Sequence, residues 1–203
     1  MYRNVFPAPC VRGRSIVLAF VFLLAVCSCA HAASEEPRAV RSDIPIPLQI
    51  QIFLKIVTYD RSFDQGTPVP YRVGVLLKNT GNGGGDTAFK QVSEALAKKT
   101  ILGRPLSPMK IVMRNGVFPK LEQLPNMLVL IGDWEEGGET VAEFARKNRL
   151  VTFGSNILLL ECGIAVIMTL EGDRPVIHVN LNEARAAGAD FHANFLKHCR
   201  VIK

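Results

Sequence analysis

The chain has 203 residues, of which 48% are hydrophobic, and its 24 basic and 18 acidic residues give a formal net charge of +6. This length suits one domain of ordinary size, and the apolar fraction excludes an intrinsically disordered chain. Neither a Gly-X-Y period nor sustained heptads occur, which excludes fibrous proteins as well.

The first 33 residues have the order of a secretory signal peptide. Three arginines precede an apolar run over residues 16–26, and Ala30-His31-Ala32 offers a cleavage site. The run is shorter than the roughly 20 residues of a spanning helix, which favours a cleaved signal over an uncleaved anchor. A lipobox-like sequence leaves acylation of Cys29 as an alternative, so we expect either a free periplasmic protein or a lipid-anchored form.

The charge of the remaining chain is nearly balanced. Residues 1–33 contain three arginines and no acidic residue, so 21 basic and 18 acidic residues remain, a charge of +3. No basic stripe or aromatic platform follows, so nucleic-acid binding is not expected. We expect a flexible leader over residues 34–43 and one domain over residues 44–203.

Hydrophobic patterns predict alternating helices and strands in this domain. Residues 48–59 have helical spacing after two prolines, although a strand is an alternative there. Runs of β-branched and large apolar residues predict the following strands, with helices between them. The expected strands cover 71–77, 109–113, 127–131 and 150–153, and the expected helices cover 87–99 and 139–147, with a helical turn over 118–124.

The last third changes pattern. Residues 164–170 and 176–181 are two β-rich runs around a turn sequence, which indicates an antiparallel hairpin. A helix capped by Asn182 and ended by Gly188 follows, and then a helix over 191–198. We therefore predict one three-layer α/β domain with a mixed sheet, mostly parallel in its first part, and a C-terminal antiparallel hairpin followed by helices.

A glycine-rich loop follows the first predicted strand. A loop between a strand and a helix can direct backbone N–H groups at a phosphate, which makes this segment a candidate site for an anionic or nucleotide-like ligand. The sequence lacks the Lys-Ser/Thr pair of a P-loop, and Asp86 would repel phosphate and suits the N-cap of the next helix. A flexible capped loop is the alternative to a ligand loop formed by Gly81, Gly83, Gly84 and Gly85.

No pattern typical of catalysis or metal binding occurs. The three histidines of the domain lack zinc spacing, and no G-x-S-x-G elbow or H-E-x-x-H pair is present. His178 alternates with apolar residues in a predicted strand, which indicates a structural histidine. We therefore expect neither enzymatic activity nor a cofactor.

The two cysteines beyond the signal, Cys162 and Cys199, would meet an oxidising compartment. These two cysteines form either a disulfide with each other or two separately buried thiols. The single tryptophan, Trp134, stands in an acidic loop after a predicted strand. It is either an exposed anchor for a partner protein or a packing residue over the sheet edge.

Several segments of the mature chain together indicate a known family. They are Pro47-Leu48-Gln49, Phe53 to Arg61, Gly74-Val75-Leu76, Val179-Asn180-Leu181, Ala184, Ala187-Gly188, Phe191, Phe195-Leu196-Lys197 and Arg200-Val201-Ile202. With these segments the chain resembles the YfiR family of bacterial secreted proteins over nearly its whole mature length. The resemblance is strongest in the C-terminal part, after the hairpin, and its second anchor is the Lys-to-Tyr-Asp-Arg segment near the start.

This resemblance implies a periplasmic α/β protein without catalytic machinery. In the best-known branch, the protein binds the periplasmic domain of an inner-membrane diguanylate cyclase and represses it, which lowers cyclic-di-GMP and biofilm formation, and an outer-membrane lipoprotein relieves the repression. We expect a similar contact surface formed by the first helix, through Phe53 and Tyr59, together with the Trp134 loop. The oligomeric state is open, a dimer included, and a small-ligand sensor that uses the glycine loop is the alternative function.

Overall fold

The structure is a computed structural model that describes residues 44–63, 69–78, 84–132, 134 and 136–203. The described residues belong to one compact unit over residues 39–203. The predicted signal peptide, the predicted leader and Cys29 lie outside the described residues.

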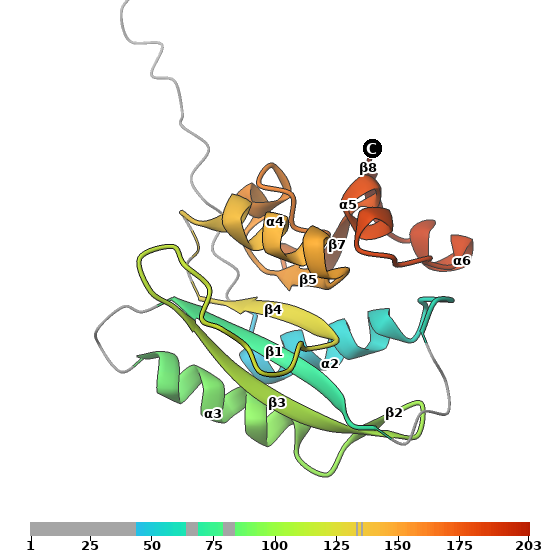
Figure 1. Ribbon diagram of the computed structural model, residues 1–203. Coiled ribbons are helices and arrows are strands. Elements are labelled where there is room, and N and C mark those ends of the chain that lie inside the picture. The colour runs from blue at the N-terminus through green and yellow to red at the C-terminus, as the bar shows by residue number, and fades with distance from the viewer. Residues whose placement is uncertain (1–43, 64–68, 79–83, 133, 135) are drawn as a thin grey trace, which may run out of the picture. The chain divides into compact units, whose positions relative to one another are not determined.

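The fold is mixed α/β, as predicted, and is built on one eight-stranded sheet (Figure 1). The strand order is β2-β3-β1-β4-β5-β6-β7-β8, in which β3, β1, β4, β5 and β6 run parallel and β6 and β7 form the predicted antiparallel hairpin. The strands are β1 (Tyr71–Lys78), β2 (Thr100–Ile101), β3 (Arg104–Met113), β4 (Met127–Ile131), β5 (Val151–Gly154), β6 (Val166–Glu171), β7 (Arg174–Asn180) and β8 (Arg200–Ile202).

Helices cover both faces of the sheet and give the predicted three layers (Figure 1). α2 and α3 pack on one face, and α4 packs on the other. The helices are α2 (Ile46–Val57), α3 (Gly84–Leu96), α4 (Gly138–Asn148), α5 (Leu181–Ala186) and α6 (Ala193–Leu196), with the 3-10 helix η2 at Ile157–Leu160.

The central strands are apolar on both sides because helices cover both faces. In β4 all five residues are buried. Leu128 and Leu130 face the α4 layer, whereas the residues that alternate with them face α2 and α3. Phe53 of α2 and Phe153 of β5 meet in the core between the sheet and the α2 and α3 layer, with ring centroids 5.1 Å apart. Since α2 covers Ile46–Val57, the prediction of a helix rather than a strand for residues 48–59 is correct.

Some predicted elements are wrong in detail. Residues 118–124 do not form a helical turn; the chain is irregular there, with a bend at residues 122 and 123, as it passes β1 on its way from β3 to β4. Asn180, rather than Asn182, caps α5, and its side chain accepts a hydrogen bond from the Glu183 N–H at 3.2 Å. The final predicted helix is shorter than expected because the chain turns at Lys197 and then adds β8 to the sheet.

Candidate functional site

The carboxyl ends of β1 and β4 form the point at which the connections of the sheet diverge. The two strands are parallel neighbours. The chain leaves β1 for α3 on one face of the sheet and leaves β4 for α4 on the other face. In open α/β sheets such a switch point leaves a crevice outside the strand ends, and ligands commonly bind there.

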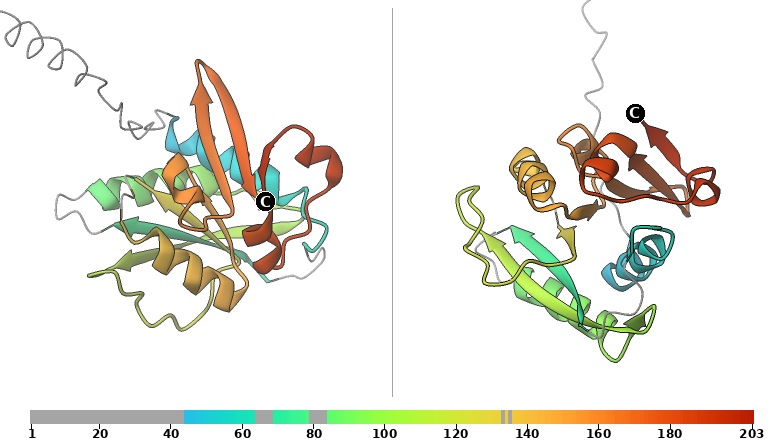
Figure 2. Two further views of the ribbon diagram at one scale, coloured as in Figure 1. Left: turned by 90° about the horizontal axis from the view of Figure 1, so that it is seen from above. Right: turned by 45° about the vertical axis from the view of Figure 1, so that its right-hand side comes forward.

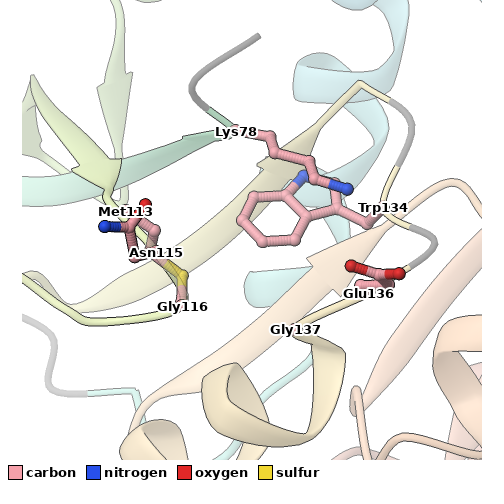
Figure 3. A pocket seen from close by; sticks show the side chains of 7 residues that line it. All are labelled: Lys78, Met113, Asn115, Gly116, Trp134, Glu136 and Gly137. Carbon is pink, nitrogen blue, oxygen red and sulfur yellow. The ribbon is translucent and has the colours of Figure 1, made fainter.

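A cavity of about 420 Å³ lies at this position (Figure 3). Three parallel strands contribute to it through their carboxyl ends or the loops that follow them, which is why residues far apart in the sequence meet here. The lining residues are Lys78 from β1, Met113 from β3, Asn115 and Gly116 from the turn after β3, and Trp134, Glu136 and Gly137 from the connection between β4 and α4.

The turn after β3 shapes one wall of this cavity. Asn115 and Gly116 have φ values of 51° and 73°, in the left-handed region that Asn and Gly adopt most readily. Arg114 and Val117 close the turn with two backbone hydrogen bonds of 2.9 and 3.3 Å. The turn therefore holds the Asn115 amide at the rim of the cavity.

Trp134 forms the opposite wall and is a packing residue. Its side chain is only 2% exposed, and its indole N–H donates to the Ile131 carbonyl at 3.2 Å. The Asn156 side-chain amide donates to the Trp134 carbonyl, also at 3.2 Å. The expectation that Trp134 anchors a partner protein from an exposed position is therefore wrong, because the indole ring packs among residues of the α4 layer.

The cavity offers groups for recognition. Its described lining contains one ammonium group, one carboxylate and one side-chain amide, together with the largely buried side chains of Met113 and Trp134. Figure 3 shows Lys78 running across the Trp134 ring with Glu136 nearby, while Met113 and Asn115 face them from the other side. No Ser, Cys or His occurs among the described lining residues. The arrangement is therefore suited to holding a small polar molecule.

A second region of interest is the junction between the end of α2 and the C-terminal segment (Figure 2, right). One carboxylate oxygen of Asp60 accepts hydrogen bonds from the Ser62 N–H at 2.9 Å, the Ser62 hydroxyl at 2.7 Å and the Asp190 N–H at 2.8 Å. Asp60 also pairs with Phe191 in a β-bridge, and the Arg61 guanidinium lies 2.6 Å from the Asp190 carboxylate. We call this group of contacts the Asp60 junction.

Tyr59 stands at the edge of the Asp60 junction and is exposed. Its ring stacks on that of Phe195 with centroids 5.3 Å apart and planes 6° apart. The Lys55 ammonium lies 5.4 Å from the centre of the Tyr59 ring, within the range of a cation–π contact. Tyr59 is 37% exposed, so the expectation of a surface position is correct for this residue.

The outer side of α2 carries a stripe of exposed and half-buried side chains. Phe53, predicted at a partner surface, is completely buried, so that prediction is wrong. Leu48, Ile52, Lys55 and Tyr59 follow one another at helical spacing and are exposed or half-buried. The signal was present in the sequence, because α2 has two apolar stripes at helical spacing and only one of them can face the sheet. We call these four residues the α2 outer stripe.

The described part of the glycine loop is helical. Gly81 and Gly83 lie outside the described residues, whereas Gly84 and Gly85 are the first two residues of α3. Asp86 therefore lies in the first helical turn instead of capping it, and its carboxylate pairs with the Lys110 ammonium of β3. An acidic residue in the first turn also favours the helix dipole. The described residues of the predicted ligand loop, Gly84 and Gly85, thus form the start of a helix.

Cys162 and Cys199 are both free thiols in the structure, so the alternative of a disulfide between them is wrong. Cys162 packs beside Gly138 of α4, whereas Cys199 packs against the core on the opposite face of the sheet. Burial raises the pKa of the Cys199 thiol to about 11. Burial, helped by the nearby Glu139 and Glu161 carboxylates, also raises the pKa of Cys162.

His178 is a structural residue of β7, as predicted. It is buried, and its Nε2 lies 3.0 Å from the Thr169 hydroxyl on the neighbouring strand. Burial and the nearby Arg200 guanidinium lower the pKa of His178. The imidazole is therefore held in its neutral form by its surroundings.

Comparison of the sequence with protein-family models and with curated proteins gives no relative. No model of a protein family matches the chain, and no curated protein matches it at a significant level. Among the helices that the structure describes, none is both long and apolar enough to span a bilayer. Within the described ranges, no three His, Cys, Asp or Glu side chains gather into a possible metal site.

Proposed function

We propose that this protein is a periplasmic regulatory binding protein that represses an inner-membrane signalling protein by contact with its periplasmic domain. The resemblance to the YfiR family favours a diguanylate cyclase as that partner. In this proposal the protein binds the inactive state of the cyclase more tightly than the active state, because only a difference in affinity can shift the equilibrium. It acts by binding, and not by catalysis.

The observation that supports this proposal is the Asp60 junction. The Tyr59-Asp60-Arg61 segment and the segment around Phe191 are the two anchors of the resemblance, and they lie some 130 positions apart in the sequence. Backbone bonds join them directly, from the Arg61 N–H to the Asp190 carbonyl and from the His192 N–H to the Tyr59 carbonyl, both at 2.9 Å. The residues that carry the resemblance thus build one continuous part of the fold.

The α2 outer stripe gives this region the character of a contact surface. Leu48 is 45% exposed at one end and Tyr59 is 37% exposed at the other, with Ile52 and Lys55 between them. At about 1.5 Å per residue the stripe is about 16 Å long. Exposed apolar and aromatic side chains along one stripe are typical of protein interfaces. The complementary surface would be apolar with a carboxylate opposite Lys55.

Variants of the α2 outer stripe test this proposal in the native host. Ile52→Glu and Tyr59→Ala should release the partner, raise cyclic-di-GMP and increase biofilm, as deletion of the gene should. The matched control is Glu143→Lys, which changes an exposed position on α4, on the other face of the sheet. Equal amounts of each variant should be verified by immunoblot. Unchanged cyclic-di-GMP on deletion of the gene would contradict the proposed function.

A further inference from the structure

We infer that the cavity at the carboxyl ends of β1 and β4 binds a small zwitterion, of the class of free amino acids, that carries both a carboxylate and an ammonium group. This inference rests on the cavity and not on the proposed contact with a membrane protein. The two regions are built from different elements, since the cavity residues come from β1, β3 and the β4–α4 connection, and the α2 outer stripe comes from α2 and the residues after it.

Position and size select the class of ligand. The cavity lies at the switch point of the parallel sheet, where the loops diverge to opposite faces and leave room beyond the strand ends. Its volume of about 420 Å³ lies at the lower end of the range typical of small-molecule sites. A dinucleotide or a peptide of several residues would not fit, whereas one amino acid would.

The charges select a zwitterion over a simple anion or cation. Lys78 and Glu136 are the two charged residues of the described lining, and their side chains do not form an ion pair with each other. An anion alone would gain the Lys78 ammonium but would be repelled by Glu136, and a cation alone would meet the reverse. A molecule that carries both charges can satisfy both side chains, while the Asn115 amide can donate to its carboxylate or accept from its ammonium group.

The remaining walls set the room for the side chain of that ligand. Met113 and Trp134 line the cavity but are only 5% and 2% exposed, since most of their surface packs in the core. Gly116 and Gly137 contribute no side chain, and both have positive φ, at 73° and 89°. Their backbone therefore lies open to the cavity at positions where a larger residue would be strained.

Trp134 makes binding directly measurable, because it is the only tryptophan of the chain and it lines the cavity. The purified protein is first titrated with each standard amino acid except tryptophan, and binding is followed by Trp134 emission and by calorimetry. We expect saturable binding of one or more of these amino acids. If none of these amino acids binds saturably at concentrations up to about 10 mM, the inference is overturned.

Modified ligands and charge variants then test the orientation. The carboxamide of the best ligand should bind at least tenfold more weakly than the acid, and this penalty should disappear in Lys78→Gln. The N-acetyl derivative should likewise lose at least tenfold, and that penalty should disappear in Glu136→Gln. Matched controls are Lys147→Gln and Glu143→Gln at exposed positions of α4, which should bind like the parent protein. Equal affinity of Lys78→Gln, Glu136→Gln and the parent protein would place the ligand elsewhere and overturn the inference.

Discussion

Replacement of Asp60 by alanine should loosen the attachment of the C-terminal segment to α2. One carboxylate oxygen of Asp60 accepts three hydrogen bonds, two from Ser62 and one from the Asp190 N–H, at distances of 2.7 to 2.9 Å. In Asp60→Ala all three donors lose their acceptor. The bond to Asp190 is the only one of the three that joins two distant parts of the chain.

The expected loss of stability follows from these three bonds. Asp60 is half-buried, so its donors can partly turn to water, and each bond contributes about 0.5–1 kcal/mol. The free energy of unfolding should therefore fall by about 2 kcal/mol, which corresponds to about 4–8 °C in Tm for a domain of this size. Asp60→Asn keeps an acceptor oxygen at the same place and should lose about half as much.

Urea denaturation followed by far-UV circular dichroism and by Trp134 emission measures these differences. Asp190→Ala is the informative control, because it removes the exposed Arg61–Asp190 ion pair but keeps the Asp190 N–H. An exposed pair contributes less than about 1 kcal/mol, so this variant should stay close to the parent protein. If Asp190→Ala lost as much as Asp60→Ala, or if Asp60→Ala lost less than about 0.5 kcal/mol, the reasoning on Asp60 would be refuted.

Three other predictions follow from the packing and from the shifted pKa values. Burial raises the pKa of the Cys199 thiol to about 11 and raises that of Cys162 as well. Both thiols should therefore react slowly with iodoacetamide at pH 8 and rapidly in denaturant. Resistance to alkylation in denaturant would indicate a disulfide instead of the two free thiols. The pKa of His178 is lowered from 6.5, so protonation of this side chain favours the unfolded chain, and the free energy of unfolding should decrease as the pH falls below 6.5. Urea midpoints measured over a range of pH should show this dependence in the parent protein and lose it in His178→Gln. The same dependence in both proteins would contradict the prediction. Gly138→Ala would place the new Cβ 2.8 Å from the Cys162 Cβ and should lower the free energy of unfolding by about 1–3 kcal/mol. Gly84→Ala, whose new Cβ has no neighbour within 4 Å, should not lower it. Equal urea midpoints for the two variants would argue against the close contact at Gly138.

The fold could be predicted from the sequence because its strong signals are periodic and local. The four parallel strands that the sequence predicted are apolar runs bounded by turns, and the hairpin is set by the Glu171–Pro175 turn sequence. β2 and β8 were missed because they have two and three residues, too few for a period to be recognised. Such short strands are fixed by tertiary pairing, as β8 is by β7.

The candidate sites could be predicted less well, because they depend on which side of an element faces the core. α2 presents apolar residues on two stripes, so the pattern alone did not separate buried Phe53 from exposed Leu48. Trp134 follows β4 in an acidic loop, yet a bond from its indole N–H to the Ile131 carbonyl turns the ring inward. The cavity joins Lys78 with Glu136, which are 58 positions apart, and only the strand order brings them together.

Site-specific photo-crosslinking in living cells tests the central proposal most directly, namely that the α2 outer stripe contacts an inner-membrane signalling protein. A photoreactive phenylalanine analogue at position 48 should give a crosslink to a membrane protein with a periplasmic domain, identified by mass spectrometry, and Ile52→Glu should abolish that crosslink. The same analogue at Val117, which is 66% exposed beyond the end of β3, should give none. No crosslink to a membrane signalling protein from position 48, or an equal yield from both positions, would contradict the account.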